Sequence, residues 1–402
     1  MGAAAEGKAM KNRERERRFY LKKEPVILTV LAVVSVLFFV FVTGLSHAFE
    51  AQQESLGSRW FARGVADLKA AHYQPAVSDL RAALQYSRED SEYQLKLAEA
   101  LIGDGRNSEA AAYLVNLWER EPENGWVNLD LARIAVQKGD RQQALRYYHN
   151  AIYATWSGNQ EVERRQARLE LVAFLLSIGD REQAESELIA LAANLENDPA
   201  QHEQAGELFF EVGDYEHALA EDGVALTEEP RDATALAGAG RASFELGRYP
   251  KAEEYFDQAL QVAPGNEQLA GELKDAELTV AMDPFRRQIS FAQRSGIVMD
   301  AFAAAGERLK ACPAAAGWSA KSSAGQSAAG GQNPGAGQSL GAEWTKMQPE
   351  ITESGLRRNP GLVESAMELV FEIERHSQAG CGALSATDKA LLRISKLRMG
   401  NS

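Results

Sequence analysis

The sequence predicts an all-α protein, in which an N-terminal transmembrane helix precedes a helix-turn-helix solenoid of about six repeats and a small helical C-terminal tail. The first observation is a Gly that is followed five residues later by an Ala, as in Gly105 and Ala110. This Ala recurs at residues 76, 110, 144, 184, 218 and 252, in steps of 34, 34, 40, 34 and 34. The second observation is an uncharged apolar segment near the N-terminus. A period of 34 residues with helical patterning is typical of a solenoid of paired helices.

The N-terminal 45 residues divide into a basic leader and an apolar segment. Residues 1–24 carry eight Lys or Arg and four Glu. The run from Val26 to Val42 contains no charged residue, and about 20 apolar residues are enough to cross a bilayer as a helix. We therefore expect a transmembrane helix over residues 25–45, which meets the membrane through residues 26–45.

The basic leader also predicts the orientation of this helix. Lys and Arg collect on the cytoplasmic side of a membrane span, so the N-terminus is expected in the cytoplasm and the repeats outside it, in the periplasm of a Gram-negative cell. A cleaved signal peptide is the alternative, because Ser46-His47-Ala48 resembles a small-x-small cleavage site. The long charged leader and the long apolar run favour the uncleaved anchor.

Residues 46–55 are interpreted as a short polar tether, and residues 56–284 as the solenoid with its capping helix. Each repeat is expected to have a small residue in its first helix, a Gly that ends this helix, and an Ala in its second helix. A larger residue four positions after the Ala would fill the space between neighbouring repeats. The first repeat has Ala71 where the turn Gly is expected, and the fifth has Asp222 where the larger residue is expected.

Two further features belong to the solenoid. The six extra residues between the third and fourth repeats fall around residues 156–160. They are expected to lengthen a loop, and display of this loop to a partner is the alternative. Residues 267–282 are amphipathic and would cap the exposed end of the last repeat, as solenoids require.

These repeats resemble tetratricopeptide repeats, and the resemblance covers residues 56–284. It rests on the turn phrase above, on the small residues of the first helices, and on the prolines that end the second helices. These residues are Gly64, Ala98, Ala132, Gly206 and Gly240, with Pro122, Pro230 and Pro264. The resemblance implies a membrane-anchored bacterial scaffold whose first helices line a concave groove for a peptide or partner protein.

Projection of the helix period from each turn predicts which side chains line this groove. They are Phe61, Lys69, Trp126, Leu129, Arg133, Glu203, Glu207, Phe210, Glu211, Arg241 and Phe244. Aromatic side chains beside mixed charges suit a protein or peptide ligand. Phe210 and Phe244 have packing between repeats as an alternative role. Glu and Arg occupy much of the face where chaperone-binding relatives carry a Lys/Asn clamp, so capture of a chaperone tail is disfavoured.

The charge distribution bears on the class of ligand. The net charge of −14 is the sum of a basic leader, a basic C-terminal region and an acidic middle, since residues 25–284 carry −22. Binding to nucleic acid depends on Lys and Arg that neutralise phosphates. We therefore expect no nucleic acid partner.

The chain after residue 284 departs from the repeat pattern. Residues 285–312 are expected to be a helical extension, interrupted at Gly296. Residues 313–342 are rich in Ala, Gly, Ser and Gln, which is typical of a flexible linker. Residues 343–402 are expected to form a small helical region that packs on the solenoid or on a partner.

Two helices are expected within this C-terminal region. Residues 360–376 are amphipathic, and Ser385 with Asp388 resembles a capping box for a final helix through Leu397. Such a region is too short to have a large core of its own.

The chain contains none of the common catalytic or cofactor motifs. The six histidines lack metal-ligand spacing, and phosphate-binding loops, dinucleotide-binding turns and serine-nucleophile motifs are missing. Whether the two cysteines, Cys312 and Cys381, form a disulfide stays open, and a nucleophilic pair of His376 and Cys381 is disfavoured. We therefore predict no enzyme activity, no cofactor and no metal.

The resulting function is a membrane-tethered adaptor, which the resemblance connects with envelope-complex assembly, secretion or cytochrome maturation. The alternatives are an enzyme with its activity in residues 285–402 and a soluble secreted adaptor released after Ala48.

Overall fold

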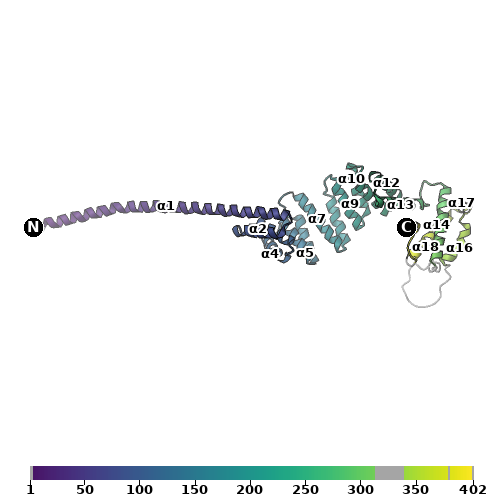
Figure 1. Cartoon of the computed structure of the whole chain (residues 1–402), viewed down its shortest axis with the longest axis horizontal. Coiled ribbons are helices and arrows are strands. Elements are labelled where there is room, and N and C mark those ends of the chain that lie inside the picture. The colour runs from purple at the N-terminus through teal and green to yellow at the C-terminus, as the bar shows by residue number, and fades with distance from the viewer. Residues whose placement is uncertain (1–2, 313–338, 379–380, 401–402) are drawn as a thin grey trace, which may run out of the picture. The chain divides into compact units, whose positions relative to one another are not determined.

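The computed structural model describes residues 3–312, 339–378 and 381–400 of the chain. These residues fold into α-helices joined by short turns, so the all-α prediction is confirmed (Figure 1). Two compact units are distinguished, Met1–Leu171 and Val172–Ser402, and each is described by itself.

The first unit begins with α1 (Ala3–Lys69), which runs without a break from the leader through the apolar segment into the first repeat (Figure 1). Its other helices are α2 (Tyr73–Tyr86), α3 (Ser91–Gly103), α4 (Asn107–Arg120), α5 (Gly125–Gln137), α6 (Arg141–Tyr153) and the first part of α7 (Gln160–Ser177). The prediction of a separate tether over residues 46–55 is therefore wrong, because this segment is part of α1. Of the helices that the structure describes, α1 is the one long and apolar enough to cross a membrane.

The second unit continues the repeats and adds the C-terminal helices. Its repeat helices after α7 are α8 (Arg181–Ala192), α9 (Pro199–Val212), α10 (Tyr215–Glu228), α11 (Ala233–Glu245), α12 (Tyr249–Val262) and α13 (Glu267–Ala281). They are followed by α14 (Phe291–Ala311), α16 (Leu340–Met347), the 3-10 helix η2 (Gln348–Glu350), α17 (Glu353–Arg358), α18 (Gly361–Gln378) and α19 (Ala386–Gly400). The six predicted repeats are thus six consecutive helix pairs, from the end of α1 with α2 to α11 with α12.

The turn within each repeat has the same backbone geometry. The turn glycines Gly105, Gly139, Gly179, Gly213 and Gly247 have φ between 72° and 94°. The next residue donates its N–H to the carbonyl five residues earlier, as Asp140 does to Ala135 at 2.9 Å. This left-handed turn satisfies the last carbonyls of the first helix. The side chain of Asp140 then accepts from the N–H of Gln143, which caps the second helix.

Ala71 makes the same turn without a glycine. Its φ is 58°, its N–H donates to Leu68 O at 3.0 Å, and the N–H of His72 donates to Asp67 O at 2.8 Å. A Cβ in the left-handed region costs about 1–2 kcal/mol. The packing of the first repeat therefore imposes a conformation that alanine itself disfavours.

Close contact between the two helices of a repeat holds the solenoid together. The repeated Ala of the second helix is at most 1% exposed in all six repeats. In the first and sixth repeats, the larger residue four positions later packs on the small residue of its own first helix, since Leu80 lies against Gly64 and Phe256 against Gly240. In these two repeats the residue therefore contacts its own helix pair, whereas a place between neighbouring repeats was predicted.

The extra residues after the third repeat fold onto the first unit. Trp156 is 5% exposed, its ring covers Gly125, and its Nε1 donates to Ala151 O at 3.0 Å. Thr155 exchanges backbone hydrogen bonds with the start of α5, to Glu123 and Gly125. The insertion is a longer loop, as expected, but its large side chain is buried.

The C-terminal helices form a second core. Helix α14 passes through Gly296 without a break, so the predicted interruption there is wrong. Cys312, at its end, forms a disulfide with Cys381, and their Cα atoms are 5.4 Å apart. Helix α16 begins at Leu340, so the linker predicted to reach residue 342 ends earlier, and its residues 313–338 lie outside the described part of the chain.

Helices α14, α18 and α19 enclose this core. Val298, Phe302, Met367 and Ile373 are at most 3% exposed. The predicted capping box is present, since the N–H of Ser385 donates to Asp388 Oδ2 at 2.8 Å and the N–H of Asp388 donates to Ser385 Oγ at 3.1 Å.

The C-terminal helix also packs on the end of the solenoid. Leu397 of α19 covers the turn at Gly247, and α13 lies against both α12 and α19. Arg393 of α19 lies 3.8 Å from Asp275 of α13. Of the two predicted locations of the tail, the structure shows the one on the solenoid.

Replacement of Ala71 by glycine tests the strain in the first turn. We expect Ala71→Gly to raise the free energy of unfolding by about 0.5–1 kcal/mol, because glycine adopts a positive φ without the Cβ clash. Thermal or urea unfolding of the full chain measures this change. Ala66→Gly, at an exposed helical position of α1, is the matched control and should lose about 1 kcal/mol. Destabilisation by both substitutions would contradict the explanation.

Candidate functional site

A cavity of about 530 Å³ opens between helices α9, α10 and α11 of the fifth and sixth repeats. Its lining contains five of the residues predicted for the groove together with small residues of the same helices. The lining residues are Ala200, Glu203, Gln204, Gly206, Glu207, Phe210, Glu211, Asp222, Thr234, Gly238 and Arg241. The structure therefore brings Glu203, Glu207, Phe210, Glu211 and Arg241 together at one place.

Helix geometry explains why the α9 residues share a face. Glu203, Glu207, Phe210 and Glu211 are spaced by four, three and one residues, which places them along one side of a helix. Helix α9 is fixed at its start by Asp198, whose side chain accepts from the N–H of Ala200 at 3.1 Å. This cap and the turn at the other end hold the face in a defined register.

An aromatic ring and a guanidinium form one side of the cavity. Arg241 of α11 has its Cζ 6.0 Å from the centre of the Phe210 ring, a distance at the outer limit of a cation–π contact. The Phe210 ring also lies 5.2 Å from the ring of Tyr215, at a tilted angle. Phe210 therefore contributes to packing with Tyr215 and to the cavity lining.

Asp222 occupies the inner part of the cavity. It stands at the repeat position that is Leu80, Leu114, Tyr148, Leu188 or Phe256 in the other repeats. The residue is only 4% exposed. A short carboxylate in place of a large apolar side chain leaves the space that forms the cavity.

Two glycines accommodate the carboxylate. A Cβ at Gly206 of α9 or at Gly238 of α11 would collide with the carboxylate of Asp222. Both helices therefore approach Asp222 through positions without a side chain. The carboxylate is thus enclosed by backbone from two helices and by the charged residues of the cavity wall.

Burial and neighbouring charges change the pKa of the Asp222 carboxyl group. Burial has the largest effect, and together with the negative charges of Glu203, Glu221 and Glu207 it raises the pKa of Asp222 to about 8. The positive charge of Arg241 acts in the opposite direction. At neutral pH the carboxyl is therefore mostly protonated when the cavity holds no ligand.

The arrangement supplies oxygen acceptors, one aromatic face and one guanidinium, which suits reversible binding. Among the residues that the structure describes, no group of three or more His, Cys, Asp or Glu could hold a metal ion. The predictions that the protein needs no metal or cofactor and is not an enzyme stay predictions.

The predicted groove residues of the first repeat lie in other surroundings. Phe61 stacks on Tyr93 with ring centres 4.3 Å apart, which is a contact between repeats. Lys69 is exposed at the end of α1. Neither residue lines the cavity between α9, α10 and α11.

Two predicted groove residues of the third repeat pack differently from each other. Trp126 is half-buried, with its ring 5.1 Å from that of Trp156 and the Lys96 Nζ 5.7 Å from its centre. Leu129 is 1% exposed and belongs to the core, so its prediction as a groove residue is wrong. Its helix carries apolar residues on more than one face, and the turn spacing alone did not distinguish them.

Arg133 is engaged by carboxylates of its own unit. It donates to Asp130 at 2.9 Å and to both oxygens of Glu170 at 2.7 and 2.9 Å. Asp130 is 2% exposed, and burial raises its pKa to about 7 against the opposing charge of Arg133. Arg133 therefore stabilises buried charge in the first unit.

Phe244 is covered by the C-terminal region. Its ring lies 5.2 Å from that of Tyr249, and the guanidinium of Arg393 lies 4.6 Å above it. Phe244 therefore contacts the C-terminal region and does not line the cavity between α9, α10 and α11. The repeat pattern could not reveal that α19 packs on this end of the solenoid.

The C-terminal region has a buried charged cluster of its own. Glu374 is fully buried, and burial followed by the charge of Asp388 raises its pKa to about 7, while Arg308 opposes this shift. Arg308 donates to the carbonyl of Ser377 at 3.3 Å and lies 3.8 Å from Asp388. Cys381 is oxidised to the disulfide, so it supplies no thiolate for a pair with His376.

In the sequence, Asp222 is recognisable only as a departure from the repeat, and the pattern does not assign it to the site. The sequence feature that could reveal the site is the absence of a large residue at this position of the fifth repeat, together with the acidic residues of its first helix. Gly238 carried no sequence signal, because its role depends on how closely α11 approaches α10.

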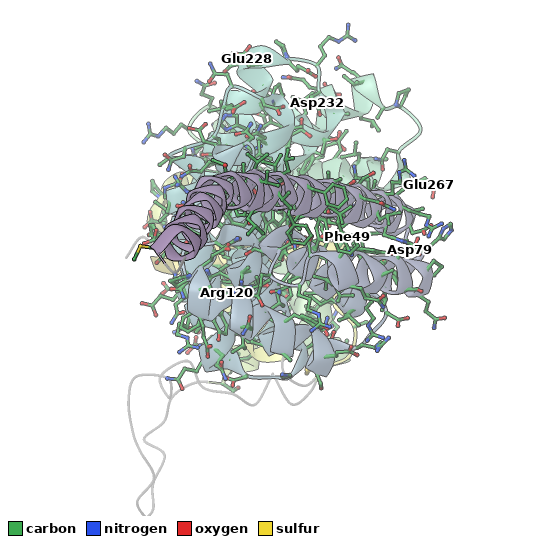
Figure 2. The ribbon with its side chains drawn as sticks, turned by 90° about the vertical axis from the view of Figure 1, so that its left-hand side faces the viewer. Phe49, Asp79, Arg120, Glu228, Asp232 and Glu267 are labelled. Carbon is green, nitrogen blue, oxygen red and sulfur yellow. A yellow bond between two sulfur atoms is a disulfide. The ribbon has the colours of Figure 1, made fainter. Side chains whose placement is uncertain are left out.

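Replacement of Asp222 tests whether the site reduces stability. We expect Asp222→Leu to raise the free energy of unfolding at pH 7 by about 1–3 kcal/mol, because it removes a buried ionisable group and restores the usual apolar residue. Urea unfolding of the full chain measures this gain. Exposed Glu228 at the end of α10, labelled in Figure 2, provides the control Glu228→Gln, which should change little.

The same site predicts a pH dependence. The pKa of Asp222 is about 8 in the folded chain and about 3.9 when unfolded, so only the folded state holds this proton between the two values. Wild-type stability should therefore fall relative to Asp222→Asn as the pH rises from 5 to 8. A difference in unfolding free energy that stays constant over this range would contradict the raised pKa.

Comparison with known families supports the repeat assignment. Two family models, both described as tetratricopeptide repeat, match residues 101–155 and 233–266. No curated protein matches the sequence.

Several solved structures have a similar fold. A structure of Pseudomonas aeruginosa PilF shares 15% identity, with 56% of this chain and 98% of that chain covered and a TM-score of 0.40. The C-terminal part of a repeat-containing protein from Cytophaga hutchinsonii shares 13% identity, covers 59% and 92%, and has a TM-score of 0.44. PilW, described as a type IV pilus biogenesis factor, shares 16%, covers 54% and 98%, and has a TM-score of 0.40.

The two family matches fall in the second to third and in the sixth repeats, and the turn geometry found there recurs in all six. The chain therefore contains tetratricopeptide repeats.

Proposed function

We propose that this protein is a non-enzymatic scaffold that binds a segment of a partner protein in the groove of its fifth and sixth repeats. Tetratricopeptide repeats are protein-interaction modules, and the family assignment supports a protein partner. The observation that carries the proposal is the cavity between α9, α10 and α11. It combines an aromatic side chain, four carboxyl groups and a guanidinium on helices that are rigidly paired.

We further propose that α1 anchors the scaffold in a membrane. Large apolar side chains on this helix are exposed, among them Phe38, Phe39 and Phe41 at 66–68%. Such a continuous apolar surface is unfavourable in water and matches the interior of a bilayer. Because α1 continues into the first repeat, the span and the scaffold would be joined by helix instead of a loose linker.

The disulfide supports an extracytoplasmic location of the repeats. Cys312 and Cys381 are bonded, and disulfides persist in oxidising compartments such as the periplasm or the cell exterior. This agrees with the orientation expected from the basic leader. Envelope-complex assembly, secretion and cytochrome maturation are the processes in which we propose that such a scaffold acts.

A site-specific crosslink tests the groove. A photoreactive amino acid in place of Gln204, an exposed residue of the cavity lining, should crosslink a protein in intact membranes. Phe210→Ala should reduce that crosslink about tenfold, because aromatic anchors dominate the binding energy of such surfaces. Tyr153→Ala, which removes an aromatic ring that is 77% exposed outside the cavity, should leave the yield unchanged. Equal yields from both variants would contradict binding in this groove.

Reporter fusions and thiol labelling test the topology. In a bacterial host, a reporter that is active only in the periplasm should be active after Ser402, and a cytoplasmic reporter should be inactive. Cys312 and Cys381 should react with maleimide only after reduction of the unfolded chain. The reverse reporter pattern would overturn the orientation. A native N-terminus at Phe49, found by mass spectrometry, would instead favour the secreted adaptor.

A further inference from the structure

We propose that the cavity of the fifth and sixth repeats binds the side chain of a lysine or arginine from the partner protein, with Asp222 as its innermost acceptor. This inference rests on the proposed scaffold function and names the chemistry of the bound segment. A basic side chain would enter beside Phe210 and end at the carboxylate of Asp222.

The wall of the cavity is acidic. Glu203, Glu207, Glu211 and Asp222 line it, and the one cationic residue of the lining is Arg241. When all these groups are ionised, the negative charges exceed the positive one by three. Such a wall attracts a cation and repels an acidic segment.

Asp222 is buried without a counter-charge in contact. The residue is 4% exposed, yet the described part of the chain offers its carboxylate no hydrogen bond and no ion pair within 4.0 Å. Arg241 acts on it only at longer range. A buried carboxyl group without a partner costs free energy unless a cation reaches it.

Asp130 in the first unit is a buried carboxylate with a structural role, and it provides a comparison for Asp222. Asp130 has a similar burial, at 2% exposed, and Arg133 donates to it at 2.9 Å. Arg133 is itself fixed by Glu170. The cation that Asp130 finds within its own unit is missing around Asp222, so we infer that the partner supplies it.

The space beside Asp222 is open. The other five repeats fill this position with Leu, Tyr or Phe, whereas Gly206 and Gly238 expose backbone on two sides of Asp222. A larger side chain at position 222 would occupy the cavity. The fifth repeat therefore has both an open cavity and a carboxyl group, that of Asp222, at the inner end of this cavity.

Binding of a cation should be coupled to release of a proton. The groups that face Asp222 are Arg241 of α11, Glu203 and Glu207 of α9, and Glu221 of α10, which is paired with His202 at 2.7 Å. A bound ammonium or guanidinium favours the ionised carboxylate. Since Asp222 is mostly protonated below pH 8 in the free protein, affinity should rise as the pH increases from 6 to 8.

Calorimetric titration of the full chain in lipid nanodiscs tests the inference. The probes are the blocked peptides acetyl-AAKAA-amide and acetyl-AARAA-amide, with acetyl-AAQAA-amide as the uncharged control, in buffer of physiological ionic strength to screen the general negative charge. We expect at least one basic peptide to bind at least tenfold tighter than the glutamine peptide. Its affinity should also increase severalfold between pH 6 and pH 8.

Three variants assign this binding to Asp222. Asp222→Asn keeps the shape of the side chain and removes its charge. It should therefore reduce the affinity for the basic peptide at least tenfold and abolish the pH dependence of this affinity. Asp222→Leu should fill the cavity and abolish binding while the protein stays folded. Glu228→Gln removes the same charge from an exposed position of the same helix and should change affinity less than twofold.

Several results would overturn the inference. These are equal binding of the basic and glutamine peptides, no binding of either basic peptide at 5 mM, and an unchanged affinity of Asp222→Asn. Spermidine that binds as tightly as the peptides would assign the cavity to free polyamines instead of a protein segment. If Asp222→Asn still yields the Gln204 crosslink at the wild-type level, the groove scaffold remains and only the basic anchor is excluded.

Discussion

The structure depends on the close approach of two helices within each repeat. An Ala that is almost fully buried in the second helix and a small residue in the first allow this approach, and a left-handed turn of fixed geometry joins the two. The buried Ala and the left-handed turn recur in all six repeats, so the chain can stack helix pairs without long-range pairing. Ala71 shows how strong this constraint is, because the turn forms there even without a glycine.

The candidate site arises where one repeat violates the packing rule. Five repeats have Leu, Tyr or Phe at the position four residues after the buried Ala, and the fifth repeat has Asp222 there. The resulting cavity is lined by the acidic face of α9 and by Arg241. Functional sites commonly reduce stability in this way, because a group that serves a ligand is not optimal for the empty fold.

The C-terminal region covers the end of the solenoid. Its core includes α14, a disulfide joins Cys312 and Cys381, and α19 packs on α13 and on the sixth repeat. In this packing Phe244 lies against Arg393 of α19. The end of the solenoid is thus protected from water by its own chain.

The sequence by itself determined the number of repeats, their register and the turn positions, because a 34-residue period fixes which residues are small and which are buried. It also predicted the final capping box of Ser385 and Asp388, since caps depend on local hydrogen bonds. Only the tertiary structure decided that Glu203, Glu207, Phe210, Glu211 and Arg241 share one cavity, that Leu129 and Phe244 are covered, and that Cys312 pairs with Cys381. These outcomes depend on contacts between segments far apart in the chain, which a periodic pattern does not encode.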